Sequence, residues 1–243
     1  MMYCFSATGN SRHMADKLGA LLGEKVQDIT HETRLDLSGR VILVCPCYYW
    51  GVPDMVRALL KKTPFPAGFP VHFVVTCGGF LGTTDHLVQA LVRPAKALCS
   101  QVRMQTNYIL RYRVDTGERL ARRLRGAEET LPGIAAAIRE GRGLYKSSPL
   151  LRPLANRMYS LYDKGRNTQP FYATDACTSC GLCAQSCPDK AITMNQGRPR
   201  WDKPKCQLCL QCLHRCPASA IEYGQATRGK ARYTYPHEKK PSR

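Results

Sequence analysis

Two runs of cysteine, each closed by a proline, constrain this chain more than any other feature. The first run reads Cys-x2-Cys-x2-Cys-x3-Cys-Pro, and the second repeats it from Cys206 onward. The repeat extends past the cysteines, because both copies continue as Cys-Pro-x-x-Ala-Ile. The sequence therefore predicts two copies of one short unit, related by a pseudo-twofold axis. The cysteines are Cys177, Cys180, Cys183 and Cys187 in the first run, and Cys206, Cys209, Cys212 and Cys216 in the second.

This spacing is typical of iron–sulfur proteins. Three thiolates two residues apart fit one short loop around a face of a [4Fe–4S] cubane, so the fourth thiolate must come from elsewhere. In the bacterial ferredoxin spacing, the fourth cysteine of each run ligates the cluster of the other run. We therefore predict two [4Fe–4S] clusters, the first on Cys177, Cys180, Cys183 and Cys216, the second on Cys206, Cys209, Cys212 and Cys187.

Two structural zinc sites are the alternative interpretation of the same cysteines. Zinc takes four ligands, so eight cysteines could supply two ions. Zinc sites do not usually show a third cysteine at the same short step, nor a terminal proline, twice over. The repeat therefore favours iron–sulfur clusters over zinc.

The length and composition of the chain bear on its domain organisation and on the cellular compartment in which it works. The chain has 243 residues, and the part upstream of the clusters is long enough to form a domain with its own core. The longest mostly apolar run, Val41 to Trp50, is too short to cross a bilayer. The first residues lack the basic and apolar regions of a signal peptide. Thirteen cysteines without an export signal argue against disulfides, so we expect a cytoplasmic protein.

The formal net charge of +18 bears on the partners. Nucleic acid is one class of partner for so basic a chain, but no aromatic RNA-binding motif or helix-turn-helix pattern is visible. A basic docking face for an acidic redox partner is a second interpretation. Charge without a specific partner is the third. We expect a redox partner protein and no nucleic acid.

The N-terminal segment has the pattern of a phosphate cradle. Met2 to Phe5 reads as a short strand, and apolar residues at helical spacing then indicate a helix that ends near Gly23. Between them lies the hydroxyl-rich turn Ser6 to Ser11. A helix N-terminus offers unpaired N–H groups and a positive dipole end to a phosphate. An ordinary helix cap is the alternative for this turn.

Strands and helices alternate from the N-terminus to Gly141. Buried strands are predicted at Val41–Cys45, Val71–Val75 and Val102–Leu110. Helices are predicted at Met55–Lys61, from Gly82 through Leu98, and around Ile134–Arg139. This alternation predicts a parallel sheet covered on both faces, with ligands at the carboxyl ends of the strands. The loops expected at that edge are 6–11, 46–53 and 76–82.

Together, these motifs resemble those of a known protein family. The part of the chain up to about Glu140 resembles the flavodoxin-like fold, and the whole chain resembles the EFR-type family of flavodoxin–ferredoxin fusion proteins. The resemblance implies an α/β doubly wound parallel sheet followed by a small α+β 2[4Fe–4S] ferredoxin-like domain. The matching motifs are Phe5–Asn10, Tyr48–Gly51, Thr76–Gly79, Asn107–Tyr108 and the two cysteine runs. The family's C-terminal Arg-Tyr-x-x-Pro signature is present as Arg232-Tyr233-Thr234-Tyr235-Pro236, whose inner pair departs from the commoner histidine or asparagine.

The resemblance also implies a bound FMN. A first group of residues would hold its phosphate, a second would face one side of the isoalloxazine, and a third would lie along its other edge. A surface aromatic cluster packed on the core is the alternative for Tyr48 to Trp50. The phosphate group would be held by Ser6, Thr8, Gly9, Asn10 and Ser11. One side of the isoalloxazine would be faced by Tyr48, Tyr49, Trp50 and Gly51, and its other edge by Thr76, Cys77, Gly78 and Gly79.

We predict four segments along the chain: a flavodoxin-like FMN domain at 1–141, a bridging helix or linker at 142–170, a 2[4Fe–4S] ferredoxin domain at 171–224, and a basic, partly disordered tail at 225–243. The bridging helix is expected to dock through an apolar stripe, although a membrane-surface helix is an alternative. The stripe is Leu151, Leu154, Met158, Leu161 and Tyr162.

The sequence favours an electron-transfer protein that passes electrons between the two clusters and FMN. The alternatives are a flavin-dependent oxidoreductase fed by the clusters, and a ferredoxin whose second domain is a flavin-free docking module. No catalytic residue can be named. His13 is expected at the surface, and Cys4, Cys45, Cys47 and Cys99 are expected to pack as small hydrophobes. Cys77 is set apart because its loop would border the flavin.

Overall fold

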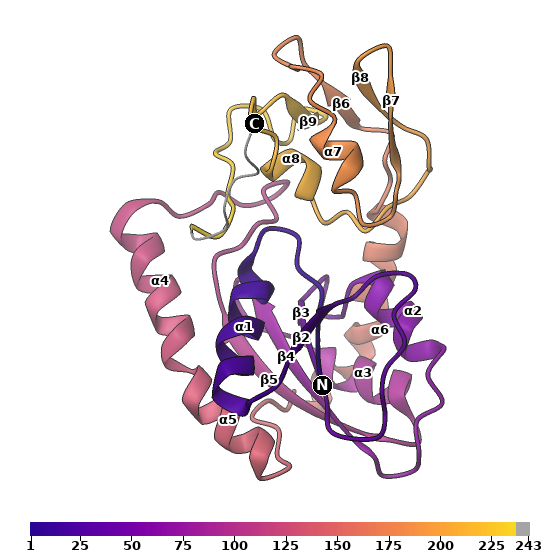
Figure 1. The fold of residues 1–243 in the computed structure, drawn as a ribbon, viewed down its shortest axis with the longest axis vertical. Helices are drawn as coiled ribbons and strands as arrows, with labels where there is room; N and C mark the ends of the chain where they lie inside the picture. The colour runs from indigo at the N-terminus through magenta and orange to yellow at the C-terminus, as the bar shows by residue number, and fades with distance from the viewer. Residues whose placement is uncertain (237–243) are drawn as a thin grey trace. The chain divides into compact units, whose positions relative to one another are not determined.

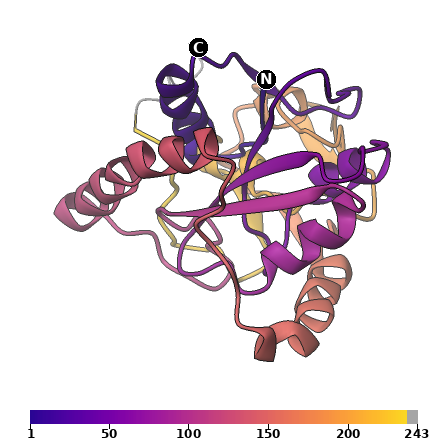
Figure 2. The same cartoon turned by 90° about the horizontal axis from the view of Figure 1, so that it is seen from below.

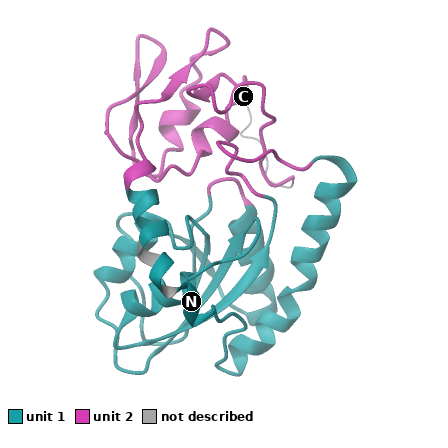
Figure 3. Cartoon of the chain, turned by 180° about the vertical axis from the view of Figure 1, so that it is seen from behind, with its two compact units in different colours: residues 1–6, 10–105, 116–163 teal, residues 7–9, 106–115, 164–243 magenta. Residues whose placement is uncertain are grey.

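A computed structural model describes residues 1–236, apart from the side chains of Arg152, Ala155 and Asn156. The chain forms two compact units (Figure 3). The first comprises Met1–Ser6, Asn10–Gln105 and Thr116–Asp163, and the second comprises Ala7–Gly9, Thr106–Asp115 and the described residues from Lys164 on. The segment boundaries that we place at 141, 170 and 224 stay a prediction.

A five-stranded parallel sheet forms the centre of the first unit (Figure 1). The strand order is β2-β1-β3-β4-β5, which is the flavodoxin-like order 2-1-3-4-5. The middle strands are runs of buried apolar residues, as expected when helices cover both faces of a sheet. The predicted flavodoxin-like fold is thus confirmed. The strands are β1 (Met2–Cys4), β2 (Val26–Asp28), β3 (Val41–Pro46), β4 (Pro70–Cys77) and β5 (Lys96–Arg103).

Helices lie on both faces of this sheet (Figure 2). Helices α1 and α5 pack together, as do α2 and α3, while α4 contacts β5. The apolar side of α1 is buried through Met14, Ala15 and Leu18, which is the periodicity that predicts this helix. The helices are α1 (Asn10–Leu22), α2 (Asp54–Lys61), α3 (Thr84–Val92), α4 (Gly117–Glu129) and α5 (Leu131–Arg139).

The last strand of the sheet differs from the prediction. A helix through Leu98 and a strand at Val102–Leu110 are wrong, because α3 ends at Val92 and β5 begins at Lys96. The cause is local: Pro94 cannot continue a helix, and it also restricts the residue before it. Helix α4 and the short strand β2 were not predicted, since α4 is rich in arginine and β2 has only three residues.

The bridging helix packs by a different face from the one predicted. Helix α6 (Arg152–Gly165) follows a short 3₁₀ turn, η1 (Pro149–Leu151). The apolar stripe is wrong in its main members, because Leu154 and Leu161 are 42% and 47% exposed. Tyr159 and Tyr162 are the described residues of this helix that are buried. The helix is therefore anchored by aromatic rings rather than by leucines.

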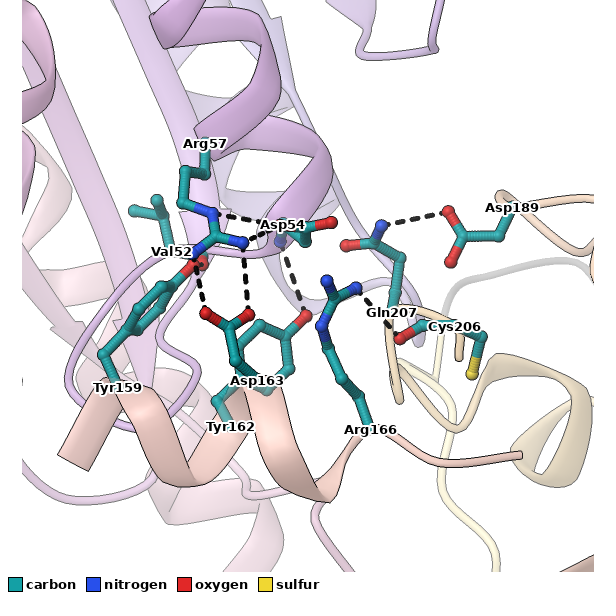
Figure 4. A network of polar contacts seen from close by, with 10 residues as sticks. All are labelled: Val52, Asp54, Arg57, Tyr159, Tyr162, Asp163, Arg166, Asp189, Cys206 and Gln207. Carbon is teal, nitrogen blue, oxygen red and sulfur yellow. Dashed lines mark hydrogen bonds and ion pairs between the residues drawn. The ribbon is translucent and has the colours of Figure 1, made fainter. Parts of the chain in front are cut away.

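Polar contacts fix this anchor within the first unit (Figure 4). The Arg57 guanidinium on α2 donates to both carboxylate oxygens of Asp163, at 2.9 and 3.1 Å, and also to Asp54. The hydroxyl of Tyr159 donates to the carbonyl oxygen of Val52 at 2.7 Å. A bidentate arginine–carboxylate pair adds geometric specificity as well as energy. These contacts hold the end of α6 against α2.

The second unit carries the cysteine runs on short elements. Two antiparallel pairs, β6 with β9 and β7 with β8, flank two single-turn helices. In the predicted tail, Thr227, Tyr233 and Tyr235 are buried, while residues 237–243 lie outside the described part; partial disorder of the tail stays a prediction. The elements are β6 (Phe171–Ala173), α7 (Leu182–Gln185), β7 (Ile192–Asn195), β8 (Arg198–Trp201), α8 (Gln211–His214) and β9 (Ile221–Tyr223).

Within the described residues, every helix is too short or too polar to cross a membrane.

Removal of the α6 anchor gives a first test. Tyr162 is 1% exposed and its ring contacts those of Tyr48, Tyr49 and Tyr159. Truncation to alanine should destabilise the first unit by about 3–5 kcal/mol, the usual cost of deleting a buried aromatic ring. Hydrogen exchange of the β3 and β4 amides measures the loss. Leu161→Ala is the matched control, expected to change stability by less than about 0.5 kcal/mol; equal losses in both variants would contradict this packing.

Candidate functional site

The two cysteine loops have the same backbone path. Each loop places residues with positive φ at equivalent positions of the repeat: 58° at Ser179 and 49° at Leu208, then 73° at Gly181 and 58° at Leu210. The single-turn helices α7 and α8 begin directly after the second of these positions. Bulky residues rarely adopt positive φ. The second loop nevertheless does so at two leucines, Leu208 and Leu210, whereas the first loop has a glycine, Gly181, at one of the two positions. The shared path is what a duplicated cofactor loop requires.

The fourth cysteine of each run is also held in the same way. The backbone N–H of Ala191 donates to the sulfur of Cys187, and that of Ala220 donates to the sulfur of Cys216, both at 3.3 Å. A third bond of this kind runs from Leu208 to Cys206, also at 3.3 Å. Hydrogen bonds to the sulfurs are one of the means by which proteins set the potential of an iron–sulfur cluster.

One cavity in the second unit is lined by cysteines from both runs. Its walls include Cys187 from the first run together with Cys206, Cys209 and Cys212 from the second. These four cysteines are the set that the sequence assigns to one cluster. Burial, followed by the neighbouring thiols of Cys209, Cys206 and Cys187, raises the pKa of Cys212. Thiols this buried need the positive charge of a metal to be held as thiolates.

The other set of cysteines is more open to solvent. Burial, the Cys180 thiol and the Cys216 thiol raise the pKa of Cys183 to about 11, although the N–H of Ala184 opposes them. Of the two thiols that raise this pKa, Cys180 belongs to the same run as Cys183 and Cys216 to the other run. Cys180 is exposed and Cys177 is half-buried, whereas Cys209 is buried. Of the two predicted cluster sites, the one built on Cys177, Cys180 and Cys183 is the outer one.

The predicted phosphate loop joins β1 to α1. Gly9 adopts a φ of 93°, and Thr8 and Ser11 are each 1% exposed. In the first unit, the Ser11 and Thr76 hydroxyls are hydrogen-bonded at 2.8 Å, and the Asn10 amide donates to the carbonyl oxygen of Gln105 at 2.8 Å. These bonds order the start of α1, whose first turn offers N–H groups and a positive dipole end. The turn fits a phosphate group.

The aromatic loop after β3 is a strained turn. Tyr49 and Trp50 have φ values of 49° and 60°, and Tyr48 and Gly51 pair through two backbone hydrogen bonds of 2.9 Å. Two-residue turns of this kind normally use Asn-Gly or similar pairs, and strain of this kind clusters at ligand sites. Trp50 packs against Phe80, with ring centroids 5.3 Å apart. The loop presents three half-buried aromatic rings, those of Tyr48, Tyr49 and Trp50, at the carboxyl edge of the sheet.

The loop after β4 lies at the same edge. The Gln101 amide holds it by donating to the carbonyl oxygen of Gly79 at 2.8 Å and to the sulfur of Cys77 at 3.2 Å. Burial, and next the Cys47 thiol, raise the pKa of Cys77 to about 12. A shift in this direction favours the neutral thiol of Cys77 over its thiolate, which is the nucleophilic form. Cys4, Cys45 and Cys99 are buried, Cys47 is half-buried, and His13 pairs with Glu128 at 2.7 Å.

Sequence reasoning missed a hydrogen-bonded group in the second unit. His214 accepts from the N–H of Tyr233 at Nδ1, so its Nε2 carries the proton and donates to the carbonyl oxygen of Asn107 at 2.7 Å. Burial lowers the pKa of His214 to about 4, which keeps the ring neutral. The Arg215 side chain donates to the carbonyl oxygen of Ala7 at 3.0 Å. Both residues lie between the predicted cluster ligands Cys212 and Cys216.

Asn107 and Tyr235 complete this group. The Asn107 amide donates to the Thr8 hydroxyl at 3.0 Å, and the N–H of Tyr235 donates to the carbonyl oxygen of Thr8 at 2.7 Å. One sequence signal could have revealed this group. The first copy of the repeat has Gln185 and Ser186 at the positions where the second copy has His214 and Arg215. Departures from an internal repeat mark contacts made by one copy alone.

Comparisons with known proteins agree with part of this picture. Residues 169–227 match the family described as a 4Fe-4S dicluster domain, a span that holds both cysteine runs. With the flavodoxin-like fold, this indicates electron transfer. No curated protein matched the chain.

Solved structures with some likeness to the chain include a protein of Bacteroides eggerthii assigned as a flavoprotein, at 17% identity and a TM-score of 0.34, covering 40% of this chain and 83% of that one. A flavodoxin from the domain Archaea matches at 14% identity and a TM-score of 0.34, covering 57% and 96%. At such scores the likenesses carry no argument, and the fold assignment rests on the strand order.

The crossed ligand sets lead to a reciprocal test. Cys187→Ala should remove the cluster that depends on Cys206, Cys209 and Cys212, because its sulfur lies with theirs in the cavity. Cys216→Ala should instead remove the cluster on the first run. EPR spectra of the reduced proteins and iron analysis identify the cluster that remains in each variant. If each variant lost the cluster of its own run, the crossed assignment would be wrong.

Proposed function

We propose that this protein transfers electrons between two [4Fe–4S] clusters and an FMN bound at the carboxyl edge of the flavodoxin-like sheet. Flavin exchanges one or two electrons and a cluster exchanges one, so the pair can convert between the two regimes. The proposal is supported by the strand order, the duplicated cysteine loops and the phosphate-cradle turn. In flavodoxin-like sheets the ligand lies where the strand order reverses, between β1 and β3.

The observation that carries the proposal is that part of the predicted FMN loop belongs to the second unit. Ala7–Gly9, the middle of the predicted FMN loop, groups with the cysteine runs rather than with the sheet. The contacts are specific, because Arg215 binds the carbonyl oxygen of Ala7 while Asn107 and Tyr235 bind Thr8. Hydrogen bonds and one peptide chain thus connect Cys216 to the loop that would hold the flavin phosphate.

The chain's own residues have separable roles in this proposal. Ser6, Thr8, Gly9, Asn10 and Ser11 would hold the phosphate. Arg215 positions the loop through the carbonyl oxygen of Ala7. The neutral ring of His214 bridges two backbone segments without adding charge beside the cluster ligands. The rings of Tyr48, Tyr49 and Trp50 would face the flavin, and aromatic stacking contributes about 0.5–1.5 kcal/mol beyond burial.

Flavin binding is tested by comparing FMN with riboflavin. Thr8→Ala should weaken FMN binding about 10- to 100-fold, since a hydrogen bond to a charged group contributes about 1.5–3 kcal/mol. Riboflavin, which lacks the phosphate, should be affected much less. Fluorescence titration of the flavin-free protein measures both affinities. Equal losses for the two flavins, or no FMN binding by the wild-type protein, would contradict the phosphate site.

The relay is tested at Arg215. After rapid mixing with a one-electron reductant, the equilibration of cluster and flavin absorbance should be independent of protein concentration. Arg215→Met should slow this equilibration at equal cofactor content, because it removes the contact with Ala7. Arg200→Met is the matched control, since that exposed arginine of the same unit pairs with its near neighbour Asp202.

The reduction potentials of the clusters and the flavin are measured in the wild-type protein and in both variants. A slower rate at unchanged potentials then reports a weaker pathway for the electron and not a smaller driving force. A wild-type rate that scales with protein concentration would mean that electrons pass between molecules, and the relay within one chain would be wrong. An unchanged rate in Arg215→Met would exclude this arginine from the relay.

A further inference from the structure

A cavity in the first unit is lined by basic side chains and has no role in the function proposed above. Its volume of about 410 Å³ lies within the range of roughly 300–1,000 Å³ that small-molecule sites occupy. One wall comes from the end of β5 and the other from α4. The lining residues are Gln101, Arg103, Arg122, Arg123, Gly126 and Thr130.

The side chains that line the cavity carry positive charge and no negative charge. Three of its six lining residues are arginines and none is acidic. Arg103 and Arg122 are exposed, and their guanidinium groups form no ion pair with the described residues. A concave surface of one charge raises the local concentration of the opposite ion. The planar fork of arginine suits the paired oxygens of a phosphate or carboxylate.

The remaining polar groups hold the wall in place. Arg123 donates to the carbonyl oxygen of Gly78 at 3.3 Å, and the Gln101 amide binds the next residue, Gly79. These bonds fix α4 and β5 to the loop after β4. The cavity is thereby located at the carboxyl edge of the sheet, where open α/β sheets bind their ligands.

A glycine forms part of the cavity wall. Gly126 lies inside helix α4, where glycine destabilises a helix relative to alanine. No packing contact requires it there, because a Cβ atom at this position would meet no atom within 4 Å. Its φ is ordinary for a helix, so the backbone does not require glycine either. Gly126 is one of the lining residues, so a large side chain at this position would compete with a ligand for the wall of the cavity.

We propose that this cavity binds the phosphate group of a small molecule. A phosphate carries a charge of about −1.5 to −2 at neutral pH and three acceptor oxygens, which suits several guanidinium groups better than the single charge of a carboxylate. The site uses residues outside the predicted FMN loops. Two of its lining residues, Gln101 and Arg123, do hydrogen-bond to Gly79 and Gly78 of one of those loops, so the two sites are neighbours and are tested separately.

The test is calorimetric titration of the full-length, cluster-containing protein with inorganic phosphate at fixed ionic strength. We expect one phosphate per chain, and Arg103→Gln with Arg122→Gln to weaken binding at least about tenfold through lost charge-assisted hydrogen bonds. Gly126→Leu should abolish binding while the helix stays intact by circular dichroism, because leucine is a better helix former than glycine. Arg125→Gln is the matched control, since this arginine of α4 pairs with Glu118 and does not line the cavity.

Succinate distinguishes the two sources of negative charge. Phosphate binding that exceeds succinate binding supports the proposal, and equal binding overturns the assignment to phosphate. Equal weakening in Arg125→Gln, or full binding by Gly126→Leu, would show attraction to a basic surface and not to the cavity. Loss of phosphate binding on saturation with FMN would place the anion in the flavin site, which also overturns the proposal. The FMN titration is read separately by fluorescence, so failure of one proposal leaves the other testable.

Discussion

The burial of several thiols around one space governs the second unit. Cys206, Cys209 and Cys212 have their pKa values raised, above all by burial, and together with Cys187 they line a cavity. Metal ligands of this kind must be deprotonated, so the free energy of binding a cluster becomes free energy of folding. The elements around the cavity are very short, with helices of four residues and strands of three or four. Such a unit has little apolar core of its own, and the cofactors would supply much of what holds it together.

The first unit is stabilised differently, by a sheet with apolar strands and helices on both faces. Helix α6 adds a contact of another kind, in which Tyr159, Tyr162 and Asp163 meet the strained aromatic turn and Arg57. The turn carries φ values that bulky residues rarely adopt. Packing from α6 compensates for that strain, because Tyr162 lies against both Tyr48 and Tyr49.

Sequence reasoning succeeded where the determinant is local. Cysteine spacing, buried strands and the turn before α1 depend on neighbouring residues, so their patterns are visible in the chain itself. It failed where a single residue overrides a pattern, as Pro94 does by ending α3 and moving β5. It also failed where aromatic and aliphatic residues share one helical period, since the pattern did not distinguish Leu154 from Tyr159. The contacts of His214 and Arg215 join residues more than 100 positions apart, and no local pattern encodes them.

The division of the chain has a consequence for how such proteins can diversify. Three residues of an N-terminal loop, Ala7–Gly9, belong to a unit that is otherwise built from residues after position 105. A cut in the connection near α6 would therefore not yield two complete modules. Exchange of the cysteine-rich segment for that of another protein would remove the partners of Ala7 and Thr8. The two halves are thus expected to be inherited together, and chimeras would have to carry the residues equivalent to Asn107, Arg215 and Tyr235 with them.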